Sequence, residues 1–208
     1  MEWQRQLILR HLFVWKIHLF HLIVTLCSSR ERLMETSLCS QDQVTADIHH
    51  SVISSFQRVR IWFTGGKHRH VMGRSSEWWE SVKIGGGAAP IETSEGWLLF
   101  YHGVSGTCNG YVYSIGGAIL DIDNPSIVKY RCENFLLTPE EWYEERGFVP
   151  NVTFPCATIH DSVSGKIAVY YGCADSYVGL AFTTVDEIVD YIKTHSHVTE
   201  SDTEIGRR

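Results

Sequence analysis

The stretch GWLLFYHGVSGTCNGYVYSIGGAILDID, residues 96–123, decides the fold class. Its runs GWLLFYHGV and NGYVYSIGGAILDID are rich in β-branched and aromatic residues and are bounded by Gly, Asn, Asp and Ser. Such runs predict antiparallel strands joined by tight turns. The later run SGKIAVYYGCADSYVGLAFTTV, residues 164–185, repeats the pattern, so strands are expected through most of the second half of the chain.

Helical signals are few and lie late in the chain. The segment TPEEWYEERG, residues 138–147, is typical of a loop or a single helical turn. The segment TTVDEIVDYIKTHS, residues 183–196, predicts an amphipathic helix with Thr184 as N-cap. Its apolar face would consist of Val185, Ile188, Val189 and Ile192. Successive strands closed by one helix predict an all-β sandwich, barrel or propeller, and periodicity does not choose among them.

Composition limits the class of protein and its partners. The 208 residues suffice for one domain or for part of a larger one. The net charge of −6 disfavours a nucleic-acid partner. The apolar first 27 residues fit neither a membrane span nor a signal peptide, because they are interrupted by Arg10, His11, Lys16, His18 and His21. Six cysteines without zinc spacing indicate reduced thiols. We therefore expect a cytoplasmic protein without a membrane role.

Several stretches resemble glycoside hydrolase family 130. They are WWESVKIGGGAAPIETSEGWLLFYHGV (Trp78–Val104), CNGYVYSIGGAILDIDNPSIVKYR (Cys108–Arg131), GFVPNVTFPCATI (Gly147–Ile159) and GKIAVYYGCADSYVGLAFTTVDEIVDYIK (Gly165–Lys193). The resemblance runs from about Lys67 to His197 and implies part of a five-bladed β-propeller with a C-terminal helix. Most members of the family are inverting β-mannoside phosphorylases, and some are β-mannosidases.

Residues 1–66 differ from this pattern. They show no steady periodicity, and local signals that disagree count against a selected fold. Codons can be chosen for His18–Lys67 so that another reading frame spells the segment that precedes GKHRHVM in the family, and the frames rejoin within Thr64–Lys67. We therefore expect a frameshifted segment at 1–66, the C-terminal portion of a propeller domain at 67–198 and a polar tail at 199–208.

The resemblance also assigns site residues. It implies phosphate binding by Lys83, Tyr101 and His102, and a retained phosphate pocket favours a phosphorylase over the hydrolytic members. Lysine suits this role because its ammonium group is a compact charge.

Sugar contacts are implied for Asp175, and Asn151 and Phe154 belong to a further motif near the cavity. A turn aspartate that caps a hairpin remains the alternative for Asp175.

Other polar groups are expected to have no catalytic role. The aspartate of a DPR-like segment, which is the general acid of the family, does not occur in this sequence, so no catalytic residue is assigned and the chain is expected to be an incomplete, inactive fragment. The four carboxylates at 140, 141, 144 and 145 are expected on a solvated loop face rather than as a catalytic pair. His68 and His70 are weak evidence for a metal. No cofactor is expected, with inorganic phosphate as co-substrate.

The resemblance thus implies a reaction and its partners. Phosphate would attack the anomeric carbon of a terminal β-1,4-linked mannose and release α-mannose 1-phosphate. The mannoside would be a mannooligosaccharide, mannosyl-glucose or mannosyl-N-acetylglucosamine, and the full-length parent could form a homo-oligomer. The alternatives are a β-mannosidase that uses water and a sugar-binding fragment without catalysis.

Overall fold

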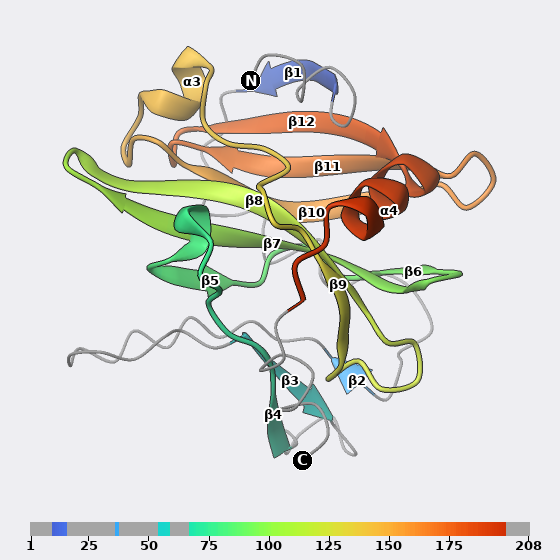
Figure 1. The fold of residues 1–208 in the computed structure, drawn as a ribbon. Helices are drawn as coiled ribbons and strands as arrows, with labels where there is room; N and C mark the ends of the chain where they lie inside the picture. The colour runs from blue at the N-terminus through green and yellow to red at the C-terminus, as the bar shows by residue number, and fades with distance from the viewer. Residues whose placement is uncertain (1–9, 16–35, 38–53, 59–66, 199–208) are drawn as a thin grey trace.

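Antiparallel strands dominate the protein. The computed structural model describes residues 10–15, 36–37, 54–58 and 67–198, and Figure 1 shows their strands and short helices. Most of residues 1–66 and the tail 199–208 lie outside the described residues, so the predictions for these two segments are not tested. Three short strands occur before residue 67, where no element was predicted: β1 (Arg10–Trp15), β2 (Thr36–Ser37) and β3 (Ser54–Arg58).

The opening stretch of sequence forms the longest hairpin. Strand β7 (Gly96–Thr107) pairs with β8 (Gly110–Leu120) along its whole length, as predicted. The hairpin is extended by β5 (Lys83–Gly85) on one side and by β9 (Val128–Arg131) on the other. The short strand β6 (Ile91–Thr93) pairs with the first residues of β7.

A second sheet contains the last three strands. Its order is β1-β12-β11-β10, with β10 at Thr153–His160, β11 at Lys166–Cys173 and β12 at Tyr177–Thr184. All its neighbouring strands are antiparallel. A third, smaller sheet joins β2 and β3 to β4 (Lys67–Met72). These sheets confirm the all-β prediction. They are open among the described residues, so the five-bladed propeller stays a prediction.

The helices are short and follow the sequence signals. The 3₁₀ helix η1 spans Trp78–Glu80, and α3 (Trp142–Glu145) is the predicted single turn. Helix α4 (Val185–Thr194) begins where predicted, because Thr184 accepts a hydrogen bond from the Glu187 amide. Its predicted apolar face packs on the core. Within the described residues, no helix has the length and apolar character needed to cross a membrane.

The β7–β8 hairpin lies between two apolar clusters. One cluster fills the space toward the second sheet, and its buried residues include Phe100, Ile115, Ile119, Ile167, Val169, Tyr171, Ile188 and Ile192. The other cluster covers the opposite face around Trp79. The indole of Trp79 lies so close to the hairpin that a Cβ at Gly103 or Gly116 would come within 2.4 Å of it. Glycine at these two positions therefore lets an aromatic ring lie directly on the strands.

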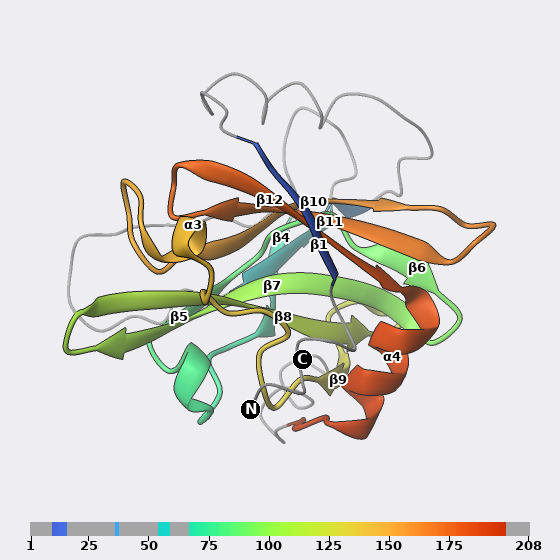
Figure 2. The same ribbon diagram turned by 90° about the horizontal axis from the view of Figure 1, so that it is seen from above.

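The two main sheets meet at one end of the molecule. A parallel bridge joins Tyr113 of β8 to Val152, which directly precedes β10. The views in Figures 1 and 2 agree that α3, β5 and the β7–β8 turn lie at this end, whereas α4 lies at the other. The predicted site residues come from the end that carries α3.

Candidate functional site

Lys83 and His102 converge on the ring of Tyr113. The Lys83 ammonium nitrogen lies 5.1 Å from the centroid of this ring. The His102 ring stacks on the same tyrosine with centroids 5.8 Å apart, and Phe154 lies against His102 with centroids 4.6 Å apart. His102 is buried, whereas the other three side chains are partly exposed. A cation and an imidazole thus lie beside each other against the same aromatic ring.

The register of three strands produces this convergence. Lys83 is opposite Val104, and Val104 is opposite Tyr113. Residues directly opposite each other in antiparallel strands share a face, and so do residues two apart along one strand. His102 therefore projects from the same face of the sheet as Lys83 and Tyr113.

The triple glycine after Lys83 contributes a backbone group. The Nδ1 atom of His102 lies 2.9 Å from the carbonyl oxygen of Gly86. Because a carbonyl oxygen only accepts hydrogen bonds, this contact fixes Nδ1 as a protonated ring nitrogen. Gly85, the first of the three glycines, ends β5.

Asn151 and Phe154 lie beside this group because β10 starts there. The Tyr113 amide donates a hydrogen bond to the carbonyl oxygen of Asn151 at 3.0 Å. The hydroxyl of Thr153 donates to the carbonyl oxygen of Tyr113 at 2.9 Å. These bonds hold the segment that contains Asn151 and Phe154 against the strand that presents Tyr113.

Asp175 lies in the turn between β11 and β12. It is exposed, and its backbone has a left-handed φ of 52°. The preceding amide, of Ala174, donates to the carbonyl oxygen of Val152 at 2.9 Å, so the turn is adjacent to Asn151 in space. Burial raises the pKa of the nearby Cys156 thiol, and the charge of Asp175 raises it further. An exposed turn position fits both a sugar contact and the alternative of a hairpin-capping aspartate.

Tyr101 points away from this group. Neighbouring residues of a strand project to opposite faces, and the side chain of Tyr101 is fully buried on the far side of β7 from His102. Its hydroxyl donates to Glu80 Oε2 at 2.9 Å and accepts from Arg131 Nε at 3.3 Å. Burial raises the pKa of Tyr101 well above its ordinary value. Its predicted role as a phosphate ligand stays a prediction, and the structure does not bring it together with Lys83.

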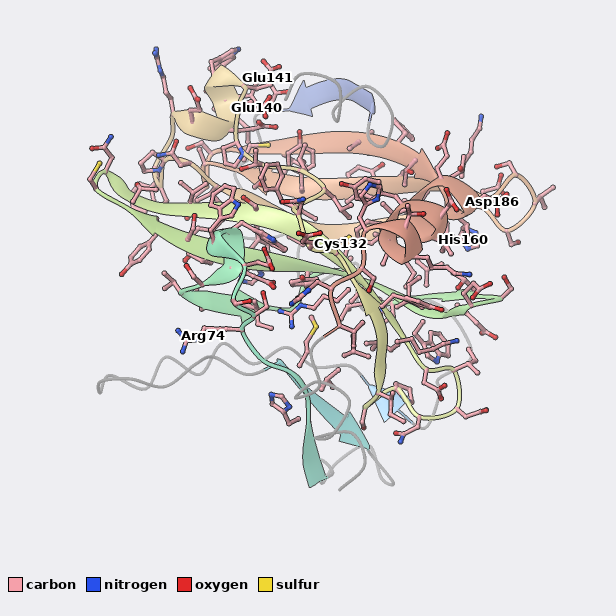
Figure 3. The ribbon with its side chains drawn as sticks, in the orientation of Figure 1. Arg74, Cys132, Glu140, Glu141, His160 and Asp186 are labelled. Atoms are coloured by element: carbon pink, nitrogen blue, oxygen red, sulfur yellow. The ribbon has the colours of Figure 1, made fainter. Side chains whose placement is uncertain are left out.

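One prediction about carboxylates is wrong. Glu140, Glu141 and Glu145 are exposed or partly exposed, and Figure 3 shows Glu140 and Glu141 at the outer edge of the molecule beside α3. Glu144 was expected with them on a solvated face, but its side chain is fully buried. The reason is that its carboxylate accepts hydrogen bonds from backbone amides and from Tyr171, which compensates for the loss of water.

Sequence reasoning also missed Tyr113 and the pair Glu80–Arg131. Tyr113 could have been found from the register, because a hairpin whose two turn residues are Cys108 and Asn109 places it opposite Val104. The ion pair, with Arg131 Nη2 2.9 Å from Glu80 Oε2, has no local signal, since its partners are 51 positions apart in the chain.

The arrangement can bind an anion next to a ligand that carries hydroxyl groups, such as a sugar. Lys83 offers positive charge, as anion binding requires. Because Nδ1–H of His102 is already donated to Gly86, this ring donates to an anion through Nε2 when both ring nitrogens carry a proton. Asn151 and Asp175 offer an amide and a carboxylate, which pair with sugar hydroxyls. Among the described residues, no three His, Cys, Asp or Glu side chains gather as a metal ion requires.

Comparisons of sequence find mannoside phosphorylases. The family model Glyco_hydro_130, described as beta-1,4-mannooligosaccharide phosphorylase, matches residues 40–194, which begins upstream of the resemblance followed from Lys67. A beta-1,4-mannooligosaccharide phosphorylase of Ruminococcus albus is 59% identical over 146 residues, covering 70% of this chain and 42% of that protein. A 4-O-beta-D-mannosyl-D-glucose phosphorylase of Bacteroides fragilis is 34% identical over 113 residues, covering 54% and 28%.

A solved structure shows the same fold. The beta-1,2-mannobiose phosphorylase of Listeria innocua, determined as a complex with beta-1,2-mannobiose, superimposes with a TM-score of 0.65 at 31% identity. The match covers 72% of this chain and 41% of that chain. This chain therefore spans less than half the length of these relatives. Since the family model matches most of the chain, the chain belongs to glycoside hydrolase family 130.

Proposed function

We propose that this chain provides the phosphate-binding part of an inverting β-1,4-mannoside phosphorylase. Phosphate would enter beside Lys83 and attack the anomeric carbon of a terminal mannose, giving α-mannose 1-phosphate. The observation that supports this most directly is the convergence of the Lys83 ammonium and the His102 ring on Tyr113. The 59% identity to the Ruminococcus albus phosphorylase supports the β-1,4 linkage.

One group of side chains would bind phosphate, and a second group would bind the mannose unit. Lys83 would neutralise charge on phosphate, and His102, oriented by the Gly86 carbonyl, would hold the anion in place. Phe154 offers an aromatic face beside His102. Asn151 and Asp175 would contact mannose hydroxyls from the adjoining turn. Each group is anchored by backbone hydrogen bonds, so the site is preorganised rather than assembled by the ligand.

The remaining parts of the proposal concern the whole protein. The sheets would form part of a five-bladed β-propeller in the cytoplasm, and the parent could be a homo-oligomer. The general acid that protonates the leaving oxygen would lie in the part of the relatives that this chain does not cover. Loss of such an acid costs roughly 10²–10⁴-fold in rate, so we propose that the chain alone is inactive.

Phosphate binding tests the proposal. Isothermal titration of inorganic phosphate into the chain should give saturable binding, and Lys83→Ala should weaken it at least about tenfold because a phosphate-facing ammonium is lost. Lys166→Ala is the matched control, since Lys166 is exposed at the start of β11 and should leave the affinity unchanged. Equal phosphate affinities for wild type and Lys83→Ala would remove Lys83 from the site.

Product analysis separates the reaction classes. The chain is incubated with β-1,4-mannobiose with and without phosphate, and we expect no turnover in either condition. Formation of α-mannose 1-phosphate would contradict the inactivity of the chain and confirm phosphorolysis. Free mannose released at the same rate without phosphate would instead identify a β-mannosidase.

A further inference from the structure

Backbone strain gathers at one place in the described residues. Besides glycines, the residues with positive φ are Asn151 at 59°, Ala174 at 47° and Asp175 at 52°. A left-handed conformation costs about 1 kcal/mol or more for Ala174 and less for Asn151 and Asp175, whose short polar side chains tolerate it. The two segments are joined directly, because the Ala174 amide donates to the Val152 carbonyl at 2.9 Å. The strained residues include both proposed polar contacts to the sugar.

The loop before β10 is tied to the β11–β12 turn by further bonds. The Val149 amide donates to the carbonyl oxygen of Ala174 at 3.3 Å, and the Phe148 amide donates to the Ser176 hydroxyl at 2.9 Å. Gly147 lies so close that a Cβ there would be 2.2 Å from the Ala174 carbonyl oxygen. The loop and the turn therefore form one unit, whose shape sets where Asn151 and Asp175 lie.

Glu144 lies at the centre of this unit. Its Oε2 atom accepts from the amides of Glu140 and Glu141 at 2.9 and 3.0 Å. Its Oε1 atom accepts from the hydroxyl of Tyr171 at 2.9 Å. Its backbone carbonyl accepts from the Val152 amide at 3.1 Å. One fully buried residue thus joins α3, strand β11 and the start of β10.

The side chains proposed to bind phosphate do not depend on these hydrogen bonds for their positions. Lys83, His102 and Tyr113 are placed by the pairing of β5, β7 and β8. Glu144 is joined to them through the backbone of Val152 and Asn151. A change confined to Glu144 should therefore affect the two halves of the site unequally.

We propose that Glu144 is a positioning residue that holds Asn151 and Asp175 in their strained conformations for contact with a β-mannoside. The inference rests on the proposed function, because it takes the sugar to bind at these two residues. Glu144 acts through the backbone of the loop and turn rather than by touching the substrate, since its carboxylate is fully buried and bonded to protein groups.

The test compares the two ligands in one variant. Glu144→Gln keeps the side-chain shape but places an amide N–H₂ against groups that donate hydrogen bonds. We expect the affinity for β-1,4-mannobiose, measured by titration calorimetry, to fall at least about tenfold while the affinity for inorganic phosphate changes less than about twofold. Glu145→Gln is the matched control, because Glu145 is the exposed neighbour and should alter neither affinity.

Hydrogen exchange gives a second readout that needs no ligand. In Glu144→Gln the amides of Val152 and Ala174 should exchange at least about tenfold faster, because the bonds they make depend on the held loop. Tyr171→Phe removes one donor to Glu144 and should shift both readouts in the same direction by a smaller factor. This second variant keeps the test decisive if Glu144→Gln fails to fold.

The outcomes separate the inference from the proposed function. A wild-type chain that binds no mannobiose overturns the proposed sugar site and this inference with it. A wild-type chain that binds, with Glu144→Gln binding equally well, overturns the inference alone. Equal losses of mannobiose and phosphate affinity also overturn it, since they indicate a general loss of structure. A loss of mannobiose affinity alone, with faster exchange at Val152 and Ala174, confirms it.

Discussion

Strand β7 presents two chemically different faces through neighbouring residues. On one face His102 meets the rings of Tyr113 and Phe154, and Lys83 lies at the partly exposed edge of this group. On the other face Tyr101 is sealed with Glu80 and Arg131, all with exposed fractions of 1% or less. Residues that are adjacent in the sequence therefore need not serve one site, because a strand directs them to opposite faces.

The two faces use charge differently. The ammonium of Lys83 lies over an aromatic ring and keeps contact with solvent, so it can receive an anion from water. Arg131 is paired with Glu80 and lies 5.6 Å from the ring of Tyr101 inside the protein. A charge that is already paired and buried is committed to the fold, whereas a half-exposed charge remains available for a ligand.

Removing the arginine from the sealed face should have the largest effect. Arg131→Met leaves the Glu80 carboxylate buried without its ion-pair partner, and we expect unfolding free energy to fall by about 3–5 kcal/mol. Urea unfolding measures this loss. Lys193→Met is the matched control, because the exposed Lys193–Glu95 pair, at 3.1 Å, should contribute less than about 1 kcal/mol. Equal losses in both variants would show that the buried Glu80–Arg131 pair contributes no more to the free energy of unfolding than an exposed pair does.

Tyr101→Phe tests whether the tyrosine belongs to the fold or to the phosphate site. Removal of its hydroxyl takes a donor from Glu80 and an acceptor from Arg131, and hydrogen bonds to charged groups contribute about 1.5–3 kcal/mol. We expect a stability loss of this size in urea unfolding, with phosphate affinity unchanged in titration calorimetry. Unchanged stability with at least tenfold weaker phosphate binding would instead place Tyr101 among the phosphate ligands, as the family resemblance implies.

Sequence patterns predicted the elements better than their contacts. Local signals located the β7–β8 hairpin, the single turn at α3 and helix α4 with its cap at Thr184. These features depend on residues within a few positions of one another. Strand alternation also predicts that Tyr101 and His102 project to opposite faces. The family resemblance nevertheless assigned both to one site, because a sequence motif gives the order of residues and not the directions of their side chains.

The missed features are those that depend on long-range packing. Glu144 occurs among four similar carboxylates, and its bond with Tyr171 on strand β11 is the long-range contact that accompanies its burial. Glu80 and Arg131 look like ordinary surface charges until the sheet brings them together. A single sequence without this pairing has no signal for either, since burial of a charge is decided by tertiary contacts.

The smallest expected effect is on the loss of stability at alkaline pH. Cys132 follows Arg131 but belongs to the apolar cluster between the two main sheets. Figure 3 labels it there, and burial raises the pKa of its thiol from 9.0 to about 12. Between these values the unfolded chain loses a proton that the folded chain keeps. This contribution to stability is therefore intact below pH 9 and falls as pH rises toward 12, by roughly 1 kcal/mol at pH 10 for this one thiol.

Cys132→Ala should remove this part of the pH dependence. Urea unfolding at pH 7 and pH 10, in the presence of a reductant, should show a loss of stability roughly 1 kcal/mol smaller in the variant than in wild type. Cys156→Ala is the comparison at a partly exposed thiol, because Cys156 is partly exposed beside Phe154 and should change the loss by less. Comparing each variant with itself at two pH values cancels the packing cost of the substitution. Identical pH dependence in wild type and Cys132→Ala would mean that water reaches this thiol and that the apolar cluster around Cys132 does not exclude solvent.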